Sequence, residues 1–297
     1  MGIKVSGLSK SINQQLIIEN VTFDWQPGRI IGLVGRNGAG KTTLFRTMAA
    51  HYLADHGTLV IDGADVAQKP AVRRRLFYID TQNNFFNYQT LSHLIKTYAL
   101  SYDHFDSQRM LRLLAEEQLA VTSHYQQLSK GQRMLFQILL ALASQTPYII
   151  LDEPFDGLDV LVRERIVTRI VDEMTSRQAS FLISSHKLDE LDGLCDQILF
   201  LKNHQLIANY DLEQLRVTAR KFQLVFPQKA VPAIVKENGQ LIKVYGRVLE
   251  VYFADYTPTI ETALQAAEPV MMADQPITVT DVFRVKLGDY QAVMVGE

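Results

Sequence analysis

The stretch that decides the fold is Ile30-Ile31-Gly32-Leu33-Val34-Gly35-Arg36-Asn37-Gly38-Ala39-Gly40-Lys41-Thr42-Thr43. It predicts a buried strand, a glycine loop and the first turn of a helix. Within it, Gly35, Gly40, Lys41 and Thr42 satisfy the pattern G-x-x-x-x-G-K-[ST] of a phosphate-binding loop. The glycines permit positive φ and close backbone approach, so successive N–H groups can turn toward phosphate oxygens.

The residues at the end of this loop have separate expected roles. Lys41 is expected to reach the β- and γ-phosphates, and the Thr42 hydroxyl to ligate Mg²⁺. The helix that begins near Lys41 adds the partial positive charge of its N-terminus. The alternative is a plain glycine-rich turn between a strand and a helix. Because a chance match to so long a pattern in this setting is rare, we predict phosphate binding.

Length, charge and cysteine content limit the class of protein. A chain of 297 residues forms one large domain or two of ordinary size. Its net charge of −2 gives no basic field that would favour nucleic acid. The single cysteine, Cys195, excludes an internal disulfide, and its apolar neighbours place it in the expected core. The N-terminus lacks the pattern of a secretory signal, and no run approaches the ~18 apolar residues that span a bilayer. A membrane role is therefore expected to come through a partner subunit.

Alternating strands and helices predict an α/β domain that binds its ligand at the carboxyl ends of the strands. Residues 3–23 alternate short apolar runs with polar turns, which predicts an antiparallel hairpin. Two continuous apolar runs, 148–151 and 181–184, are typical of strands buried on both faces of a parallel sheet. Helices are expected over residues 90–100, 106–119, 133–144 and 160–177.

The pattern changes near residue 215, which predicts a large domain over 1–215 and a small α+β domain over 216–297. In the small domain we expect strands over 221–226, 240–245 and 248–253, and helices over 257–267 and 280–287. Its methionines and aromatic residues are expected in the core, namely Met271, Met272, Tyr245, Tyr252 and Phe253. We hypothesise that this domain strengthens self-association or gates activity.

Three polar residues follow the two predicted parallel strands. Asp152 ends the run 148–151 and is placed to hold Mg²⁺, directly or through water. Glu153 would point the other way in extended backbone, where it can polarise a water that attacks a phosphate. His186 follows the second strand and could contact the terminal phosphate. An isolated Asp-Glu pair or histidine is more often structural, but the phosphate loop upstream reverses that preference.

Over about residues 1–214 the chain resembles the ATP-binding subunits of ABC transporters. GRNGAGKTT (35–43) matches the phosphate loop of that family, and YIILDEP (148–154) matches its strand-borne Asp-Glu pair. His186 matches the family's switch histidine. LSKGQ (128–132) is similar to the family signature LSGGQ and is the most discriminating element. The resemblance implies an ABC ATPase fold, with an antiparallel β subdomain and a helical subdomain attached to the phosphate-loop core.

Further positions match this family. Gly157-Leu158-Asp159 resembles the loop that crosses to the partner subunit, and Gln82 stands where the family places a glutamine that senses Mg²⁺ and the membrane partner. The resemblance implies that the cofactors are ATP and Mg²⁺ and that the activity is ATP hydrolysis. The implied ATP-binding residues are Gly35, Arg36, Asn37, Gly38, Ala39, Gly40, Lys41, Thr42, Thr43, Gln82, Ser129, Gly131, Gln132, Asp159 and Ile12. The implied catalytic residues are Glu153, His186 and Lys41, and the implied metal ligands are Thr42, Gln82 and Asp152.

The signature implies a partner. Ser129 and Gly131 precede an expected helix, so their N–H groups and the helix dipole would form a second anion site. In the arrangement implied by the resemblance, two subunits sandwich two ATP molecules head to tail, and each phosphate loop faces the Ser129 of the other subunit. The partner is a second copy of this chain or a closely related ABC ATPase subunit. ATP binding would close this interface and hydrolysis would open it.

Two positions depart from the family pattern. Lys130 replaces the glycine that is usual at the third position of the signature, and it either adds attraction to phosphate or is simply solvated; we favour the solvated state. Ile12 stands where the family often stacks an aromatic ring on adenine. Ring stacking is then lost, so we expect modest nucleotide affinity and poor discrimination between bases.

One domain of this type per chain predicts a subunit that energises a separate integral membrane subunit at the cytoplasmic face of the cell membrane. The resemblance is strongest to the bacitracin-resistance type of bacterial exporter subunit, which implies export. The rival interpretations are a soluble ABC ATPase with a non-transport role and a regulatory protein that binds nucleotide without turnover. A run of aromatic residues forms either the core of the helical subdomain or a groove for the membrane subunit: Phe85, Phe86, Tyr88, Tyr98, Tyr102 and Phe105.

Overall fold

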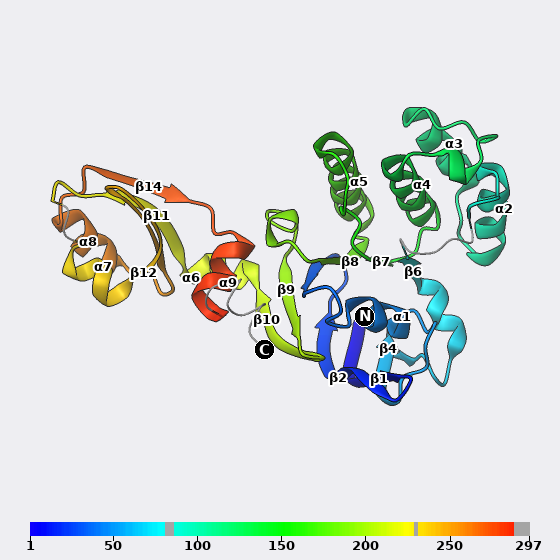
Figure 1. The fold of residues 1–297 in the computed structure, drawn as a ribbon, viewed down its shortest axis with the longest axis horizontal. Helices are drawn as coiled ribbons and strands as arrows, with labels where there is room; N and C mark the ends of the chain where they lie inside the picture. The colour runs from blue at the N-terminus through cyan, green and yellow to red at the C-terminus, as the bar shows by residue number, and fades with distance from the viewer. Residues whose placement is uncertain (81–85, 229–230, 288–297) are drawn as a thin grey trace. The chain divides into compact units, whose positions relative to one another are not determined.

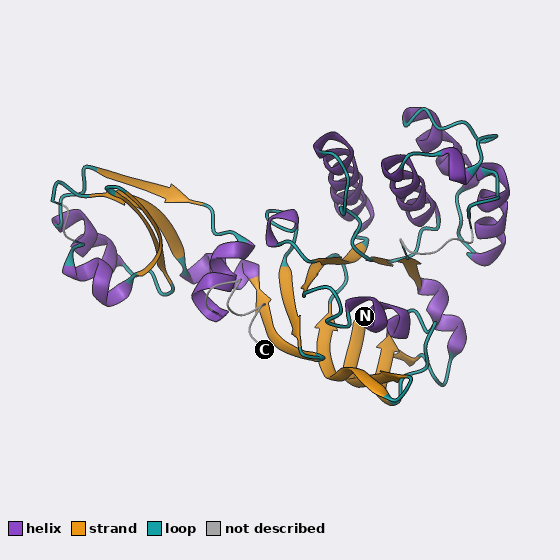
Figure 2. Ribbon diagram, in the orientation of Figure 1, coloured by secondary structure: helices purple, strands orange, loops and turns teal. Residues whose placement is uncertain are grey.

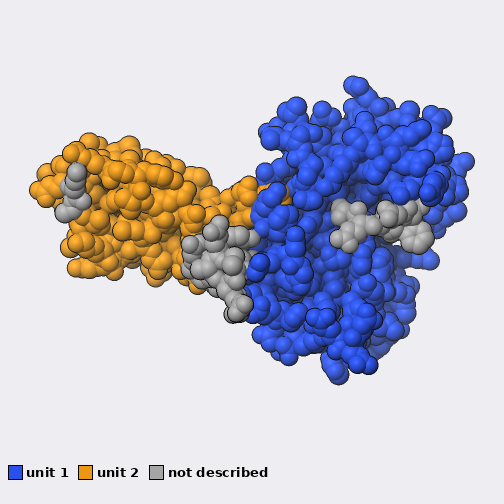
Figure 3. All heavy atoms as spheres, viewed as in Figure 1, with its two compact units in different colours: residues 1–187, 194–209 blue, residues 188–193, 210–297 orange. Residues whose placement is uncertain are grey.

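The structure is a computed structural model that describes residues 1–80, 86–228 and 231–287. The chain divides into two compact units, one of Met1–Lys187 with Leu194–Asn209 and one of Leu188–Gly193 with Tyr210–Glu297 (Figure 3). Separate hydrophobic clusters lie in the two units. The domain boundary that we place at residue 215 stays a prediction.

An antiparallel sheet of four strands forms the N-terminal part of the first unit, in the order β2-β1-β4-β5. The bounds are Ile3–Ile12 for β1, Gln15–Trp25 for β2, His56–Ile61 for β4 and Ala64–Asp65 for β5. Strands β1 and β2 make the expected hairpin. Along β2 the buried residues Val21, Phe23 and Trp25 alternate with exposed ones, so one face of this sheet packs on the core.

The second sheet carries the phosphate loop. Its order is β10-β9-β3-β8-β7-β6, with β3 in the interior and parallel to both of its neighbours. The bounds are Ile30–Val34 for β3, Leu76–Ile79 for β6, Tyr148–Leu151 for β7, Ser180–Ser185 for β8, Gln197–Lys202 for β9 and Gln205–Asp211 for β10. Because β3, β6, β7, β8 and β9 run parallel, their carboxyl ends meet at one edge.

Helix α1 (Lys41–Met48) packs one face of this sheet against the antiparallel sheet (Figures 1 and 2). Its Leu44, Phe45 and Met48 are buried at helical spacing in the same cluster as β7 and β8 residues. The rings of Trp25 and Tyr148 meet edge to face with centroids 5.3 Å apart, which joins β2 to β7. Helix α1 is therefore fixed on both sides, and the loop before it is held in place.

Four further helices form the helical part of the first unit (Figure 1). They are α2 (Leu91–Ser101), α3 (Ser107–Glu116), α4 (Lys130–Ala143) and α5 (Val160–Arg177). The expected bounds of α5 are confirmed. Helix α4 begins three residues earlier than the expected Arg133, because Ser129 and Gln132 form a capping box at its N-terminus. Short 3₁₀ turns lie at Pro70–Arg75 and Tyr125–Gln127.

The second unit contains an antiparallel sheet in the order β12-β13-β11-β14. Its strands are β11 (Arg220–Val225), β12 (Gln240–Tyr245), β13 (Val248–Phe253) and β14 (Met271–Gln275). Its helices are α6 (Leu212–Thr218), α7 (Ala233–Asn238), α8 (Pro258–Ala266) and α9 (Val279–Leu287), together with a 3₁₀ turn at Leu188–Glu190.

The sequence pattern misses three elements of this unit, namely α6, α7 and β14. Tyr252 and Phe253 are buried as expected, whereas Tyr245 is 60% exposed and Met271 is 37% exposed. The prediction that Tyr245 and Met271 belong to the core is wrong, because both lie on edge strands of the sheet. Cys195, in the first unit, is buried as expected.

Within the described ranges, no helix has both the length and the hydropathy that crossing a membrane requires.

Candidate functional site

The phosphate loop leaves β3 and enters α1 with two glycines that the structure requires. A Cβ atom on Gly35 would lie 2.7 Å from the carbonyl oxygen of Leu201, and one on Gly40 would lie 2.6 Å from the carbonyl oxygen of Ile17. Gly40 also has φ 107° and caps α1 without a side chain. The loop is therefore pressed between β2 and the end of β9, and only glycine fits at these two positions.

Lys41, the first residue of α1, turns back over the loop. Its Nζ donates to the carbonyl oxygens of Gly35 at 2.7 Å and Arg36 at 3.2 Å, and lies 3.0 Å from Oε1 of Glu153. Only 5% of the residue is exposed. A buried ammonium needs such partners, and phosphate oxygens offer the same acceptor chemistry. Lys41 is thus held where it can bind an anion inside the loop.

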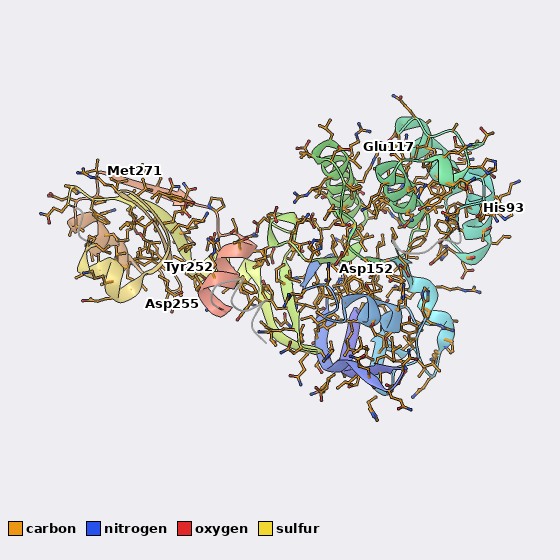
Figure 4. All side chains as sticks on the ribbon, in the orientation of Figure 1. His93, Glu117, Asp152, Tyr252, Asp255 and Met271 are labelled. Carbon is orange, nitrogen blue, oxygen red and sulfur yellow. The ribbon has the colours of Figure 1, made fainter. Side chains whose placement is uncertain are left out.

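Asp152 follows β7 and joins two strands and α1 (Figure 4). Its carboxylate accepts hydrogen bonds from the hydroxyls of Thr42 and Ser184, each at 2.7 Å. Burial raises the pKa of Asp152 above the usual range of a carboxyl, while these two hydrogen bonds and the charge of Lys41 act in the opposite direction. Ser184 was not predicted as a site residue, although it lies only two residues before His186 on β8, the strand next to β7.

Glu153 differs from the expected extended conformation. Strand β7 ends at Leu151, and Glu153 has φ 49°, in the left-handed region that a residue other than glycine rarely adopts. Its N–H donates to the Ser184 hydroxyl at 2.9 Å, which holds this turn. One carboxylate oxygen then faces Lys41 and the other lies 3.5 Å from Nδ1 of His186. The strained backbone conformation of Glu153 therefore places its carboxylate between Lys41 and His186.

The donor set suits Mg²⁺. The Thr42 hydroxyl and the Asp152 carboxylate are hard oxygen ligands 2.7 Å apart, close enough to belong to one coordination shell. Among the residues that the structure describes, no group of three His, Cys, Asp or Glu side chains forms a dedicated metal cage. Such a cage is not needed, because Mg²⁺ is usually bound by one or two protein oxygens together with substrate phosphates and water.

A pocket of about 490 Å³ opens above the loop. Its lining consists of Ile17, Asn37, Gly38, Gly40, Lys41, Thr42, Thr43, Asp152 and Glu153. Ile17, which the sequence argument did not single out, supplies apolar surface from β2. Ile12, Arg36 and Ala39 are not among these lining residues; Ile12 pairs with Gln15 at the end of the β1–β2 hairpin. Contact of Ile12 with a nucleotide base stays a prediction.

The signature residues do not line this pocket, and Ser129 and Gln132 form hydrogen bonds with each other. The Ser129 hydroxyl accepts the N–H of Gln132 at 3.2 Å, and the Gln132 side chain accepts the N–H of Ser129 at 3.0 Å. Gly131 lies inside α4 and does not precede it, so our expectation for its position was wrong. Asp159 caps α5 by accepting the N–H of Val162 at 2.9 Å. None of these residues lines the pocket over the phosphate loop.

Two other expected residues have different outcomes. Lys130 keeps a largely exposed side chain, as the solvated state requires, and its Nζ lies 3.1 Å from a carboxylate oxygen of Asp156, a partner that was not expected. Attraction of Lys130 to phosphate stays a prediction. Gln82 lies outside the described residues.

The comparisons agree with this geometry. The family model described as ABC transporter matches residues 18–156. The ABC transporter ATP-binding protein YtrB of Bacillus subtilis is 30% identical over 286 residues, covering 96% of this chain and 98% of YtrB. The chain belongs to the ATP-binding proteins of ABC transporters. Because the alignment with YtrB spans nearly all of both chains, it includes the second unit as well as the phosphate-loop unit.

Other members of this family match mainly the first unit. The lipopolysaccharide export system ATP-binding protein LptB of Haemophilus influenzae is 30% identical, over 72% of this chain and 92% of LptB. A solved ATP-binding subunit of an ABC transporter is 29% identical, with a TM-score of 0.66 over 73% of this chain and 92% of that structure. The dimeric ABC cassette MJ0796, solved bound to ADP and Pi, shares the fold with a TM-score of 0.63 at 20% identity. The predicted ABC ATPase fold is thus confirmed.

Proposed function

We propose that two copies of this ABC ATP-binding subunit, or one copy and a close relative, hydrolyse Mg-ATP between them and so drive a separate membrane subunit. The observation that carries the proposal is the contact of Lys41 with Glu153 at the phosphate loop, with His186 on the other side of the same carboxylate. A cation for the terminal phosphate, a candidate general base and a histidine therefore lie within one site.

The proposed chemistry assigns one role to each group. Lys41 and the loop N–H groups would bind the β- and γ-phosphates, and Thr42 with Asp152 would hold Mg²⁺, which neutralises developing charge on phosphate oxygens. Glu153 would orient and deprotonate the attacking water. His186, 3.5 Å from Glu153, would position that carboxylate and the γ-phosphate. Gln82 keeps its proposed place as a further Mg²⁺ ligand.

The need for a partner follows from the signature. Ser129 caps the N-terminus of α4, which is a ready anion site, yet Ser129 does not line the pocket of its own chain. In the proposed sandwich, Ser129, Gly131 and Gln132 of one copy approach the ATP of the other, and Asp159 crosses the same interface. The cassette MJ0796, which shares this fold, is described as dimeric and bound to ADP and Pi, and this agrees with a dimeric form for the proposal.

A groove lined by β6, the 3₁₀ turn Pro70–Arg75, α2 and α4 supports docking of a membrane subunit. Its volume is about 440 Å³. Phe77, Tyr98 and Tyr102 stack in its wall with centroids 5.1 to 6.1 Å apart, and Arg73 and Asp80 also line it. Apolar rings with a charged rim suit an amphipathic helix of the partner. Phe86 packs on Tyr98 and Tyr125 and so serves the core as well, while Tyr88 is 82% exposed and Phe85 lies outside the described residues.

We further propose export, at the cytoplasmic face of the cell membrane, as in the bacitracin-resistance type of transporter. LptB, a relative at 30% identity, is an export-system subunit by its name. The second candidate, a soluble ABC ATPase with a non-transport role, is disfavoured by the aromatic groove.

The test is purification of the tagged chain from detergent-solubilised membranes, followed by ATPase measurement with and without Mg²⁺. The proposal predicts that an integral membrane subunit co-purifies and that phosphate release requires Mg²⁺. Recovery of the active chain only from the soluble fraction would favour the non-transport alternative.

A further inference from the structure

Lys130 and Asp156 form an ion pair between the first residue of α4 and the loop that precedes α5. Nζ of Lys130 lies 3.1 Å from Oδ2 of Asp156, and the side chains are 63% and 49% exposed. Lys130 directly follows Ser129 in the signature, and Asp156 directly precedes the Gly157-Leu158-Asp159 loop. The pair therefore joins two segments of one chain, both of which approach the partner's nucleotide in the proposed dimer.

A second contact joins the same two segments. A Cβ on Gly131 would lie 3.1 Å from Cγ1 of Val162, so the first turns of α4 and α5 are nearly in contact. Gly157 has φ +64°, and a Cβ there would lie 2.7 Å from Nζ of Lys130. The absence of a side chain at Gly157 thus leaves the room that the lysine occupies beside Asp156.

We propose that Lys130 is an exchangeable cation that is held by Asp156 in the separate subunit and is transferred to the γ-phosphate of the partner's ATP when the dimer closes. This inference rests on the proposed function, because it requires the head-to-tail sandwich. It deepens that function by naming Lys130 as a binding residue and Asp156 as its competitor.

The energetics favour exchange over a permanent brace. An ion pair this exposed is a weak restraint, because solvent and salt screen it. A γ-phosphate carries more negative charge than one carboxylate, and at the interface it would stand beside the N-terminus of α4, where the helix dipole also favours an anion. Lys130 lies one residue from the Ser129 cap and has a long, flexible side chain, so it can change partner without unfolding the helix.

Asp156 also lies within electrostatic reach of the chain's own site. The hydrogen bond from Lys130 holds the pKa of Asp156 below its usual range, and the charges of Lys130, His186 and Lys187 act in the same direction. When Lys130 leaves, Asp156 loses its ion-pair partner within electrostatic reach of His186 and Lys187. ATP binding in one site would therefore change the electrostatic environment of His186 in the other site.

The test uses the full chain carrying Glu153→Gln, a change chosen to trap the ATP-bound dimer, and measures by analytical ultracentrifugation the ATP concentration at half dimerisation. Lys130→Met should raise this concentration about two- to five-fold, since the free energy of an exposed ion pair corresponds to a change in affinity of that order. Asp156→Asn should lower it by a similar factor, because the competitor is gone. The double variant should behave as Lys130→Met, and both shifts should shrink at high salt.

Matched controls are Lys96→Met on α2 and Asp172→Asn on α5, both exposed and both expected to leave the midpoint unchanged. If Lys130→Met and Asp156→Asn shift the midpoint in the same direction, the pair is a static brace and the exchange is wrong. Unchanged midpoints in both variants would also overturn it. If the Glu153→Gln parent does not dimerise with ATP at all, the proposed function itself fails, which separates the two failures.

Discussion

The Lys41 ammonium lies 3.0 Å from one carboxylate oxygen of Glu153, and His186 lies 3.5 Å from the other. The carboxylate proposed as the general base is therefore placed between Lys41 of the phosphate loop and the imidazole of His186. Ser184 fixes this arrangement by accepting the N–H of Glu153 and donating to Asp152. The two adjacent acids thus have different partners and different proposed tasks.

The first prediction concerns Glu153→Gln. The amide keeps the shape of the side chain but cannot accept a proton, so phosphate release should fall by about 10²- to 10⁴-fold. ATP binding should remain, because Lys41 and the loop are intact. Lys41→Ala is the contrasting variant, and it should lose ATP binding itself. Steady-state phosphate release and equilibrium ATP binding check both, and wild-type turnover in Glu153→Gln would exclude the proposed base.

The second prediction is a pH dependence at Asp152. Burial raises its folded pKa above the ordinary value of 3.8. The folded state then binds the proton more tightly than the unfolded state, so the contribution of Asp152 to stability falls as pH rises from 3.8 through the folded pKa. Asp152→Asn should therefore have a larger free energy of unfolding than the wild type at neutral pH.

That stability difference should vanish below pH 3.8, where Asp152 is protonated in both states. Urea unfolding of both proteins across this range measures it. Asp152→Asn should at the same time lose Mg²⁺-dependent phosphate release, since a carboxylate ligand is gone. A pH-independent difference in unfolding free energy would show that burial does not perturb this carboxyl.

The third prediction concerns a buried ion-pair network in the helical part. Glu173 is 2% exposed and accepts hydrogen bonds from Arg109 and Arg177. Glu173→Ala should lower the free energy of unfolding by about 3–5 kcal/mol, because two arginines lose their buried partner. The matched control is Asp103→Ala. This change removes an exposed ion pair with Arg74 and should lower the free energy of unfolding by less than about 1 kcal/mol. Chemical denaturation measures both, and equal effects would contradict the assignment.

The fourth prediction concerns the segment that follows His186. Residues Leu188–Gly193 belong to the second unit, and there the Asp192 carboxylate accepts the N–H of Val279 at 2.5 Å. Asp192→Ala should leave this N–H without its acceptor, at a cost of about 1–3 kcal/mol. Because the segment begins two residues after His186, ATP turnover should fall as well.

Thermal unfolding and phosphate release measure these two effects. Asp255→Ala is the control, since Asp255 is an exposed acid of the same unit (Figure 4). A drop in melting temperature with unchanged turnover would show that this contact of the second unit does not affect ATP turnover. Truncation after Leu215 that left both dimerisation and turnover unchanged would exclude the accessory role proposed for the C-terminal residues.

Most of the first unit is predictable because local and tertiary signals agree there. The apolar run Tyr148–Leu151 ends in two acids, and Asp159 caps the helix that follows, so both elements have the expected bounds. The phosphate loop is likewise specified by its glycines. In contrast, β14 (Met271–Gln275) has a short mixed sequence of apolar and polar residues and lies at a sheet edge, where no alternation of buried and exposed residues marks it.

The contacts of the site were less predictable than its residues. The left-handed turn at Glu153 depends on Ser184, which lies 31 positions away in the sequence. The pair of Lys130 with Asp156 spans 26 positions and depends on how α4 packs against α5. Such contacts are set by the assembled fold and leave no local pattern, which is why the ion pair of Lys130 was not predicted and the extended state expected for Glu153 was wrong.

The central claim is that a competent site needs the phosphate loop of one copy and the signature of another. The direct measurement is phosphate release by a mixture of Lys41→Ala and Ser129→Ala chains, each inactive alone. Random pairing makes half of the dimers mixed, each with one intact composite site, so the mixture should regain up to about a quarter of the wild-type rate. A mixture as inactive as its components, or a strictly monomeric wild type that hydrolyses ATP at full rate, would contradict the claim.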